Sequence, residues 1–234
     1  MGNPHTPGLP SVATKRTATF RKLLLSGPEH NQFLPRGEVI DGSQSRDPTN
    51  TGDLDVLQAG LLMGRITATG LYAPSILGVT TVAYDNSASV NTTLTVGLPT
   101  AVELNRRIGA SGTFNLTGPP TAGGTVAVQT VTYSSVAVGT GVIAVSAIAA
   151  DAIAGSFIQP TDGPETMVTL INDGSGIEVT DEDNADVDVP FATPVIAGLL
   201  DASQIINWPS NAVLRTYVRD QLRNNINVIL NHVF

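Results

Sequence analysis

The sequence predicts a mainly β protein with an extended amino-terminal arm and a carboxy-terminal helix. Three observations support this fold class. From residue 56 onward, short runs rich in Leu, Ile, Val and Thr are separated by glycines; three prolines interrupt the first ten residues; and apolar residues recur at helical spacing near the carboxyl end. Because 23 of the 234 residues are glycine and 15 are proline, we expect many short strands rather than a few long ones.

The most informative segment is residues 56–74, VLQAGLLMGRITATGLYAP, whose apolar runs are broken at Gly60, Gly64 and Gly70. Such runs predict two or three short strands joined by tight turns. Glycine is needed where the backbone takes a positive φ, or where another segment approaches too closely for a side chain. These three core turn glycines therefore predict a compact scaffold unit that carries no catalytic side chains.

We divide the chain into five parts at its Pro- and Gly-rich junctions. These are an extended arm (1–35), a first part of the β core (36–78), an inserted β-rich module (79–165), a second part of the β core (166–208) and a carboxy-terminal helix (209–234). Within the module, Thr100 and Glu103 have the spacing of a capping box, which predicts one short helix that ends at Gly109.

Further strands are predicted after this short helix. Residues 125–138 and 141–148 are rich in Val, Thr and Ala, and the glycines between them predict a hairpin. Residues 157–159 and 166–171 are expected to add strands. In the last part, Pro209 ends the preceding segment and Ser210 or Asn211 can cap the helix. That helix covers its own sheet or docks a partner, and we favour the first interpretation.

The composition predicts a surface that is partly covered by other subunits. The chain is 41% apolar, 5% aromatic and 14% charged, whereas an ordinary soluble domain has roughly 25% charged residues. Because a charge-poor surface favours association, we expect the protein to assemble with itself or with others. The net charge of −8 argues against nucleic acid as a partner. No uninterrupted apolar stretch is long enough for a membrane span, so we expect no membrane partner.

The residue types needed for catalysis are scarce or scattered. The absence of cysteine excludes disulfides, thiolate metal sites and thiol nucleophiles. Lysine occurs only at positions 15 and 22, which excludes a P-loop and a carrier domain with a lysine at a hairpin tip. His5, His30 and His232 have no acid or nucleophile at motif spacing. We therefore predict a protein that is not an enzyme, with no catalytic residues and no cofactor.

Charge is segregated along the chain, because residues 108–214 contain no lysine or arginine. The densest acidic run, residues 181–188, has the oxygen ligands that calcium prefers. Its spacing fits no EF-hand loop or RTX repeat, so we favour a solvated turn between strands and predict no metal site.

The amino-terminal segment is basic and then apolar. Its candidate contact residues are Lys15, Arg16, Phe20, Arg21, Lys22, Leu23, Leu24 and Leu25. One interpretation is an arm that adds a strand to the sheet edge of another subunit. The other, of equal weight, is a disordered tail followed by the first strand of the domain itself.

Residues 57–74, with LQAG, MGRITATG and YAP, resemble the core of the tailed-phage head decoration proteins of the lambda D type. Those proteins share an apolar-x-Ala-Gly turn, a Gly-Lys/Arg-Ile/Val-Thr-Ala-Thr/Ser-Gly strand, and a following aromatic residue and proline. Residues 195–208, with AGLLDA, are similar to a later strand of the same family. The chain departs from the family in its length, in the inserted module and in the terminal helix.

The resemblance implies a small barrel-like β-tulip domain that forms homotrimers on the outer surface of a phage capsid. It further implies that the arm residues bind the major capsid protein and that the protein, made in the host cytoplasm, stabilises the virion. Two alternatives stay open. The chain is another virion component, such as a head fibre base, a tail or a baseplate protein, or it is a glycan-binding β-protein.

Overall fold

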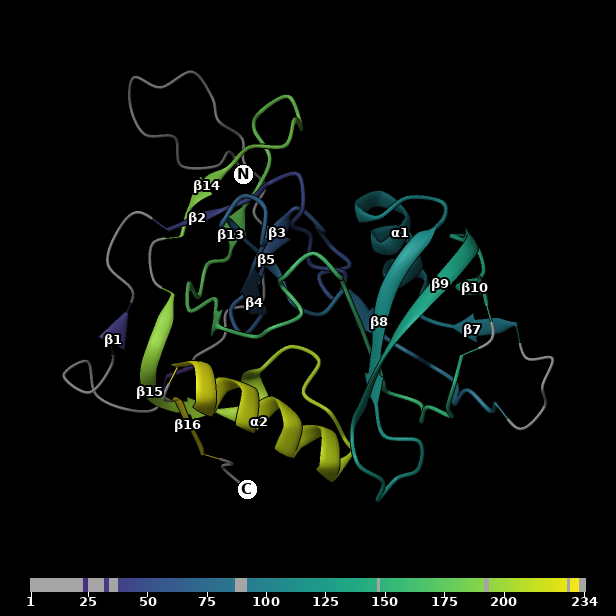
Figure 1. Cartoon of the computed structure of the whole chain (residues 1–234). Helices are drawn as coiled ribbons and strands as arrows, with labels where there is room; N and C mark the ends of the chain where they lie inside the picture. Colours follow the sequence, from purple (N-terminus) through teal and green to yellow (C-terminus); the bar gives the residue numbers. More distant parts are fainter. Residues whose placement is uncertain are drawn as a thin grey trace, which may run out of the picture.

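The computed structural model describes residues 23–24, 32–33, 38–86, 92–146, 148–191, 194–226 and 228–231. Within this part of the chain the fold is mainly β, as the sequence predicts, with two α-helices (Figure 1). The strands form four sheets, and the buried apolar side chains form three clusters between them.

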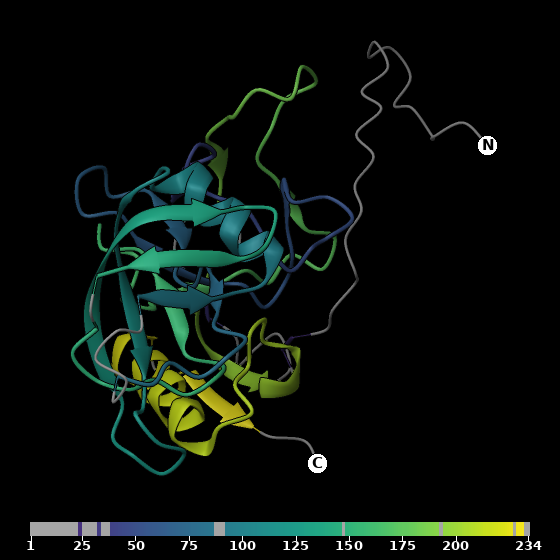
Figure 2. The ribbon, with the colours of Figure 1, turned by 90° about the vertical axis from the view of Figure 1, so that its right-hand side faces the viewer.

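The largest sheet has six antiparallel strands in the order β6-β11-β8-β9-β10-β7 and curls into a half-barrel around one helix (Figure 2). Its elements, in chain order, are β6 (Gly78–Val79), β7 (Thr93–Thr95), α1 (Leu98–Arg107), β8 (Gly112–Gly118), β9 (Ala127–Ala137), β10 (Val142–Val145) and β11 (Phe157–Gln159). The core cluster inside the curl draws only on residues between Leu77 and Ile158. This range nearly coincides with the module expected from the sequence. That the module folds as a separate unit stays a prediction.

The hairpin predicted inside this sheet is confirmed. Strand β9 turns into β10, and Val142 pairs with Ala137 and Ile143 with Val136. Gly141 has φ 71°, and a Cβ placed on it would lie 2.2 Å from the carbonyl oxygen of Val96. The turn therefore needs glycine both for its backbone conformation and for its close contact with the segment before α1.

The short helix of this module is present, but the predicted capping box is wrong. Helix α1 follows Gly97, whose position carries no side-chain cap, and Pro99 lies in its first turn. Thr100 is buried against Gly78, where an added Cβ would meet its Oγ1 at 2.0 Å. Glu103 instead forms an ion pair with Arg106. A proline in the first turn thus takes the place of a capping side chain at the start of this helix.

A five-stranded sheet in the order β12-β4-β5-β2-β14 and a two-stranded sheet of β13 and β3 form the second part of the fold. Their bounds are β2 (Val39–Ile40), β3 (Val56–Leu57), β4 (Leu62–Arg65), β5 (Tyr72–Pro74), β12 (Thr169–Leu170), β13 (Ile177–Glu178) and β14 (Val189–Pro190). Segments on both sides of the six-stranded sheet in the sequence meet here. The ring of Tyr72 packs edge-on against Phe191, with centroids 5.3 Å apart.

The third part holds the two ends of the described chain. Its sheet consists of β1 (Gln32–Phe33), β15 (Val195–Asp201) and β16 (Val228–Asn231). A short 3₁₀ helix (Ala202–Gln204) follows β15 in the chain, and α2 (Ala212–Ile226) precedes β16. Leu214, Val218 and Leu222 of α2 pack into a cluster with Leu170 and Leu200. The helix therefore covers its own sheets, which is the interpretation favoured from the sequence (Figure 1).

Candidate functional site

The segment that holds the three core turn glycines forms three short strands, β3, β4 and β5, in agreement with the two or three predicted. Strands β4 and β5 pair with each other, whereas β3 pairs with β13. Gly60 lies in a turn and Gly70 directly after one, but Gly64 lies inside β4, so its prediction as a turn glycine is wrong. A Cβ on Gly64 would lie 2.3 Å from the carbonyl oxygen of Pro164, and one on Gly60 2.2 Å from that of Gln204. Gly70 has nothing within 4 Å of its added Cβ, but its φ is 74°. Two glycines are thus required by close backbone contacts, and the third by its conformation.

Arg65 and Tyr72, both in this unit, form its main polar contact. The Arg65 Nε donates to the Tyr72 hydroxyl at 2.9 Å, and its guanidinium carbon lies 4.9 Å from the centre of the ring. Its Nη2 donates to Glu38 at 2.5 Å. The hydrogen bond to Tyr72 is the main cause that raises the pKa of Arg65, whereas burial raises the pKa of Tyr72. These three side chains hold strands together.

The structure describes only two of the candidate arm residues, and both lie against the chain's own β15. Leu23 is 1% exposed and packs among the apolar side chains under α2. Its carbonyl accepts from the backbone N–H of Asp201 at 2.9 Å, and Leu24 forms an antiparallel bridge with Leu200. The first strand contact here is therefore made within the chain.

The other candidate arm residues lie outside the described residues: Lys15, Arg16, Phe20, Arg21, Lys22 and Leu25. Their capsid-binding role stays a prediction. For Leu23, burial in its own core leaves no side-chain surface with which to bind a partner.

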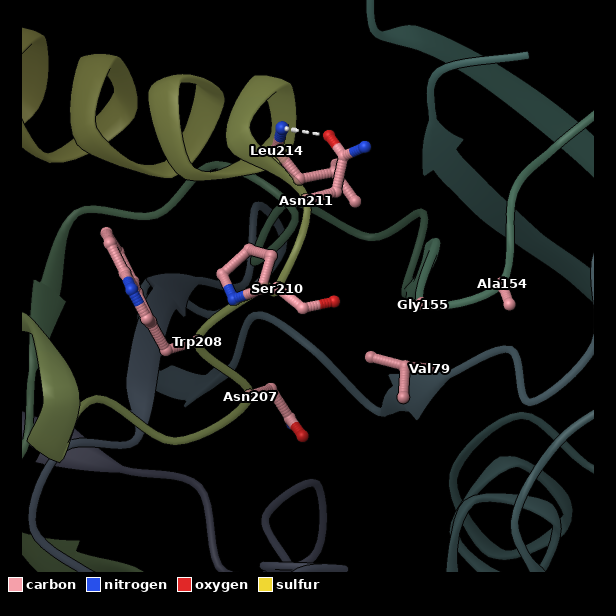
Figure 3. A pocket seen from close by; sticks show the side chains of 9 residues that line it. Val79, Ala154, Gly155, Asn207, Trp208, Ser210, Asn211 and Leu214 are labelled. Carbon is pink, nitrogen blue, oxygen red and sulfur yellow. Dashed lines mark hydrogen bonds between the residues drawn. The ribbon is translucent and has the colours of Figure 1, made fainter. Parts of the chain in front are cut away.

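A pocket of about 270 Å³ lies between β6, the loop before β11 and the segment that leads into α2 (Figure 3). Asn211, on its rim, caps α2 by accepting from the N–H groups of Val213 and Leu214 at 2.9 and 3.1 Å. The Asn207 Nδ2 and Trp208 Nε1 atoms are buried without a hydrogen-bond partner in the structure. The residues around the pocket include no acid, base or histidine, so it offers no proton-transfer chemistry.

The acidic run forms an exposed loop between β13 and β14. The Asp181 carboxylate accepts from the backbone N–H groups of Asp183 and Ala185, both at 2.9 Å. Asp186 pairs with Arg46, and Asp188 accepts from the N–H of Gly42 at 3.1 Å. Within the described ranges, no group of three or more His, Cys, Asp or Glu side chains is arranged to hold a metal ion.

A network that the sequence did not predict joins this loop to the rest of the fold. The Arg46 side chain is 10% exposed and pairs with Asp55 at 2.5 Å and with Asp186. It also donates to the carbonyl oxygens of Gly42 and Ser45. The network was missed because Arg46 lies in a loop without periodicity, where no sequence signal indicates its partners.

Helix α1 is tied to the neighbouring sheets by its two final arginines. Arg106 donates to the carbonyl oxygen of Ser43 at 2.5 Å. The Arg107 side chain is 1% exposed, donates to the carbonyl oxygen of Pro74 at 3.0 Å and pairs with Asp162 at 3.4 Å. Desolvation lowers the pKa of Arg107. Both arginines therefore fasten the curled sheet to the segments around β2 and β5.

Comparison with protein-family models, curated proteins and solved structures gives no match to the chain. No helix among the described residues is long and apolar enough to cross a membrane. The three histidines without a catalytic partner at motif spacing lie outside the described ranges: His5, His30 and His232.

Proposed function

We propose that this chain is a structural virion protein that decorates a phage capsid, stabilises it by binding the outer surface of the major capsid protein lattice, and associates with itself as a homotrimer. The observation that carries the proposal is the geometry of residues 56–74. The segment that resembles the decoration-protein core folds as three short strands, of which β4 and β5 pair with each other and β3 pairs with β13. Gly60 and Gly64 lie where neighbouring backbone leaves no room for a side chain.

A second support is the direction in which the chain enters the fold. Leu23 and Leu24 lie beside β15, so the basic segment that precedes them is covalently anchored at this sheet. This segment carries positive charge in a protein with net charge −8, and its basic residues are Lys15, Arg16, Arg21 and Lys22. Such a segment is suited to an acidic surface or to a free sheet edge on a neighbouring capsid subunit.

Stabilisation of a shell needs no tight single contact. Each arm contact is weak, but a trimer presents several of them to adjacent capsid subunits at a high effective concentration. Many such contacts over one shell resist its expansion together. The composition agrees with this arrangement, because only 14% of the residues are charged and a covered surface does not need more.

The direct test is co-sedimentation of the purified chain with matching phage capsids that lack decoration. The full chain should pellet with the capsids and saturate at a fixed ratio. A variant without residues 1–22 should stay folded, because Leu23 and its contacts are retained, and should remain in the supernatant.

The matched control is a variant that lacks residues 1–14 and keeps the basic cluster from Lys15 to Lys22. We expect this variant to bind like the full chain if the basic cluster supplies the contact with the capsid. Equal binding by the full chain and by the variant without residues 1–22 would refute the arm as the binding element. Failure of every form to bind matched capsids would refute the proposed function.

A further inference from the structure

A second pocket, of about 260 Å³, lies where helix α1 ends, beside the start of β8 and the segment that follows β11. Its lining combines one arginine, two threonines, two apolar side chains and one acid: Arg107, Thr113, Thr161, Ile108, Pro160 and Asp162. The volume lies just below the range of pockets that hold drug-sized ligands. A ligand of this pocket is therefore small.

The side chain of Arg107 is buried without a full set of partners. It is 1% exposed, and its Nη1 donates to the carbonyl oxygen of Pro74 at 3.0 Å. The other edge of the guanidinium carries the Nε and Nη2 hydrogens, which form a fork that binds a carboxylate through two hydrogen bonds. On this edge, Nε is buried with no hydrogen-bond partner among the described residues. Nη2 contacts only Asp162, at 3.4 Å.

The buried charge of Arg107 is poorly compensated. A buried cation needs a close, hydrogen-bonded countercharge to offset the loss of its hydration. The 3.4 Å contact with Asp162 is longer than the distance of about 2.8 Å that is usual between a cation and a carboxylate. Glu103 already accepts two hydrogen bonds from Arg106, at 2.8 Å each. Desolvation accordingly lowers the pKa of Arg107, although Asp162 opposes this effect.

Asp162 is the partner that can move. Its side chain is 46% exposed, and a single long contact to a half-exposed carboxylate holds it weakly. Its backbone is fixed independently, because its carbonyl oxygen accepts from the N–H of Thr67 at 2.8 Å. Rotation of the Asp162 side chain into solvent therefore opens the Nε–Nη2 edge of Arg107 to the pocket without moving the chain.

We propose that this pocket binds a small carboxylate with a short apolar tail, whose two oxygens replace Asp162 on the Nε–Nη2 edge of Arg107. The carboxylate supplies the countercharge and accepts from both N–H groups. The tail packs against Ile108 and Pro160. A neutral ligand would leave the arginine uncompensated. The inference is independent of the proposed capsid function, since it needs only the purified chain.

The test is a titration of the purified full chain with sodium butyrate, followed by ¹H–¹⁵N NMR of the arginine Nε–H groups. The signal missing from Arg107→Lys, which keeps the charge but lacks the fork, identifies Arg107. We expect this signal to shift saturably in the wild type, with a dissociation constant of about 1 to 10 mM. Sodium chloride at the same ionic strength should leave it in place, and so should butyramide, the neutral amide of the same shape.

Two variants sharpen the test. Asp162→Asn removes the competing negative charge and should bind butyrate at least about threefold more tightly than the wild type. Arg106→Lys is the matched control, because Arg106 is held by Glu103 and does not line the pocket, and it should bind like the wild type.

An Arg107 signal that butyrate does not shift overturns the proposal, and so does an equal shift with chloride or butyramide. Asp162→Asn binding no more tightly than the wild type overturns it as well, because Asp162 would then not be the group displaced. If Arg107→Lys does not fold, Arg107 is identified as the Nε–H signal that Asp162→Asn moves, and the same outcomes decide.

Discussion

The guanidinium of Arg65 lies over the ring of Tyr72, 4.9 Å from its centroid, while its Nε donates to the hydroxyl of the same side chain at 2.9 Å. One arginine thus contacts both the π face and the polar end of one tyrosine. The pair joins β4 to β5 inside the glycine-rich unit, and Glu38 extends it to the segment before β2.

Replacement of Arg65 by alanine should lower the free energy of unfolding by about 1 to 2 kcal/mol, the sum of one hydrogen bond and a partly exposed cation–π contact. Urea denaturation measures this loss. Arg219→Ala, at an exposed position of α2, should change stability by less than about 0.5 kcal/mol. Equal effects of the two substitutions would show that the pair contributes nothing specific.

Gly64→Ala should destabilise the protein strongly, by about 3 kcal/mol or more, because the added Cβ meets backbone rather than a movable side chain. The nearest atoms are the carbonyl oxygens of Pro164 and Thr166, at 2.3 and 2.5 Å. Gly123→Ala is the matched control, since nothing lies within 4 Å of its added Cβ. Thermal melting of both variants tests this, and a Gly64→Ala variant as stable as the control would contradict it.

Loss of the Asp186 carboxylate should loosen the acidic loop and cost about 2 kcal/mol, as expected for hydrogen bonds to a charged partner. Asp186→Asn removes the ion pair with Arg46 but keeps the shape of the side chain. Asp183→Asn changes the same net charge in the same exposed loop, without touching the network. Urea midpoints should fall for the first variant only; a similar fall for both would attribute the effect to net charge.

Stability should fall as the pH rises above about 10, the ordinary pKa of tyrosine. Burial raises the pKa of Tyr133 in the folded state, so its contribution is complete below the unfolded pKa and is lost as the pH rises toward the folded one. Its hydroxyl also donates to the carbonyl oxygen of Gly109 at 2.7 Å. Melting temperatures between pH 8 and 11 should therefore fall less steeply for Tyr133→Phe than for the wild type. Parallel curves would exclude this tyrosine as a source of the pH dependence.

The sequence predicted those turns, hairpins and helix caps whose formation depends on residues close to them in the chain. The turns at Gly60 and Gly70, where φ is positive, the hairpin at Gly141 and the cap at Asn211 all depend on backbone conformation or on residues a few positions away. Gly64 is different, because it lies inside β4 and is required by its contact with the distant Pro164. Glu103 shows where such local patterns fail as predictors. Its spacing from Thr100 fits a capping box, yet in the fold it pairs with Arg106.

Long-range contacts could not be predicted in this way. Arg46 meets Asp186 across 140 residues of chain, and Leu23 meets β15 near the other end of the sequence. No periodicity links such positions, because their proximity is set by how the sheets pack. For the same reason the sequence could not decide between the two interpretations of the arm; the burial of Leu23 in the chain's own core bears on that position alone.

The proposed function places this protein on the outside of a phage head. Electron microscopy of purified particles that carry the chain, with a tag at its carboxyl end, measures this most directly. We expect density for the chain at regular positions over the whole outer shell, in hundreds of copies per head. A few copies or a dozen, confined to a vertex, a tail or a baseplate, would contradict it.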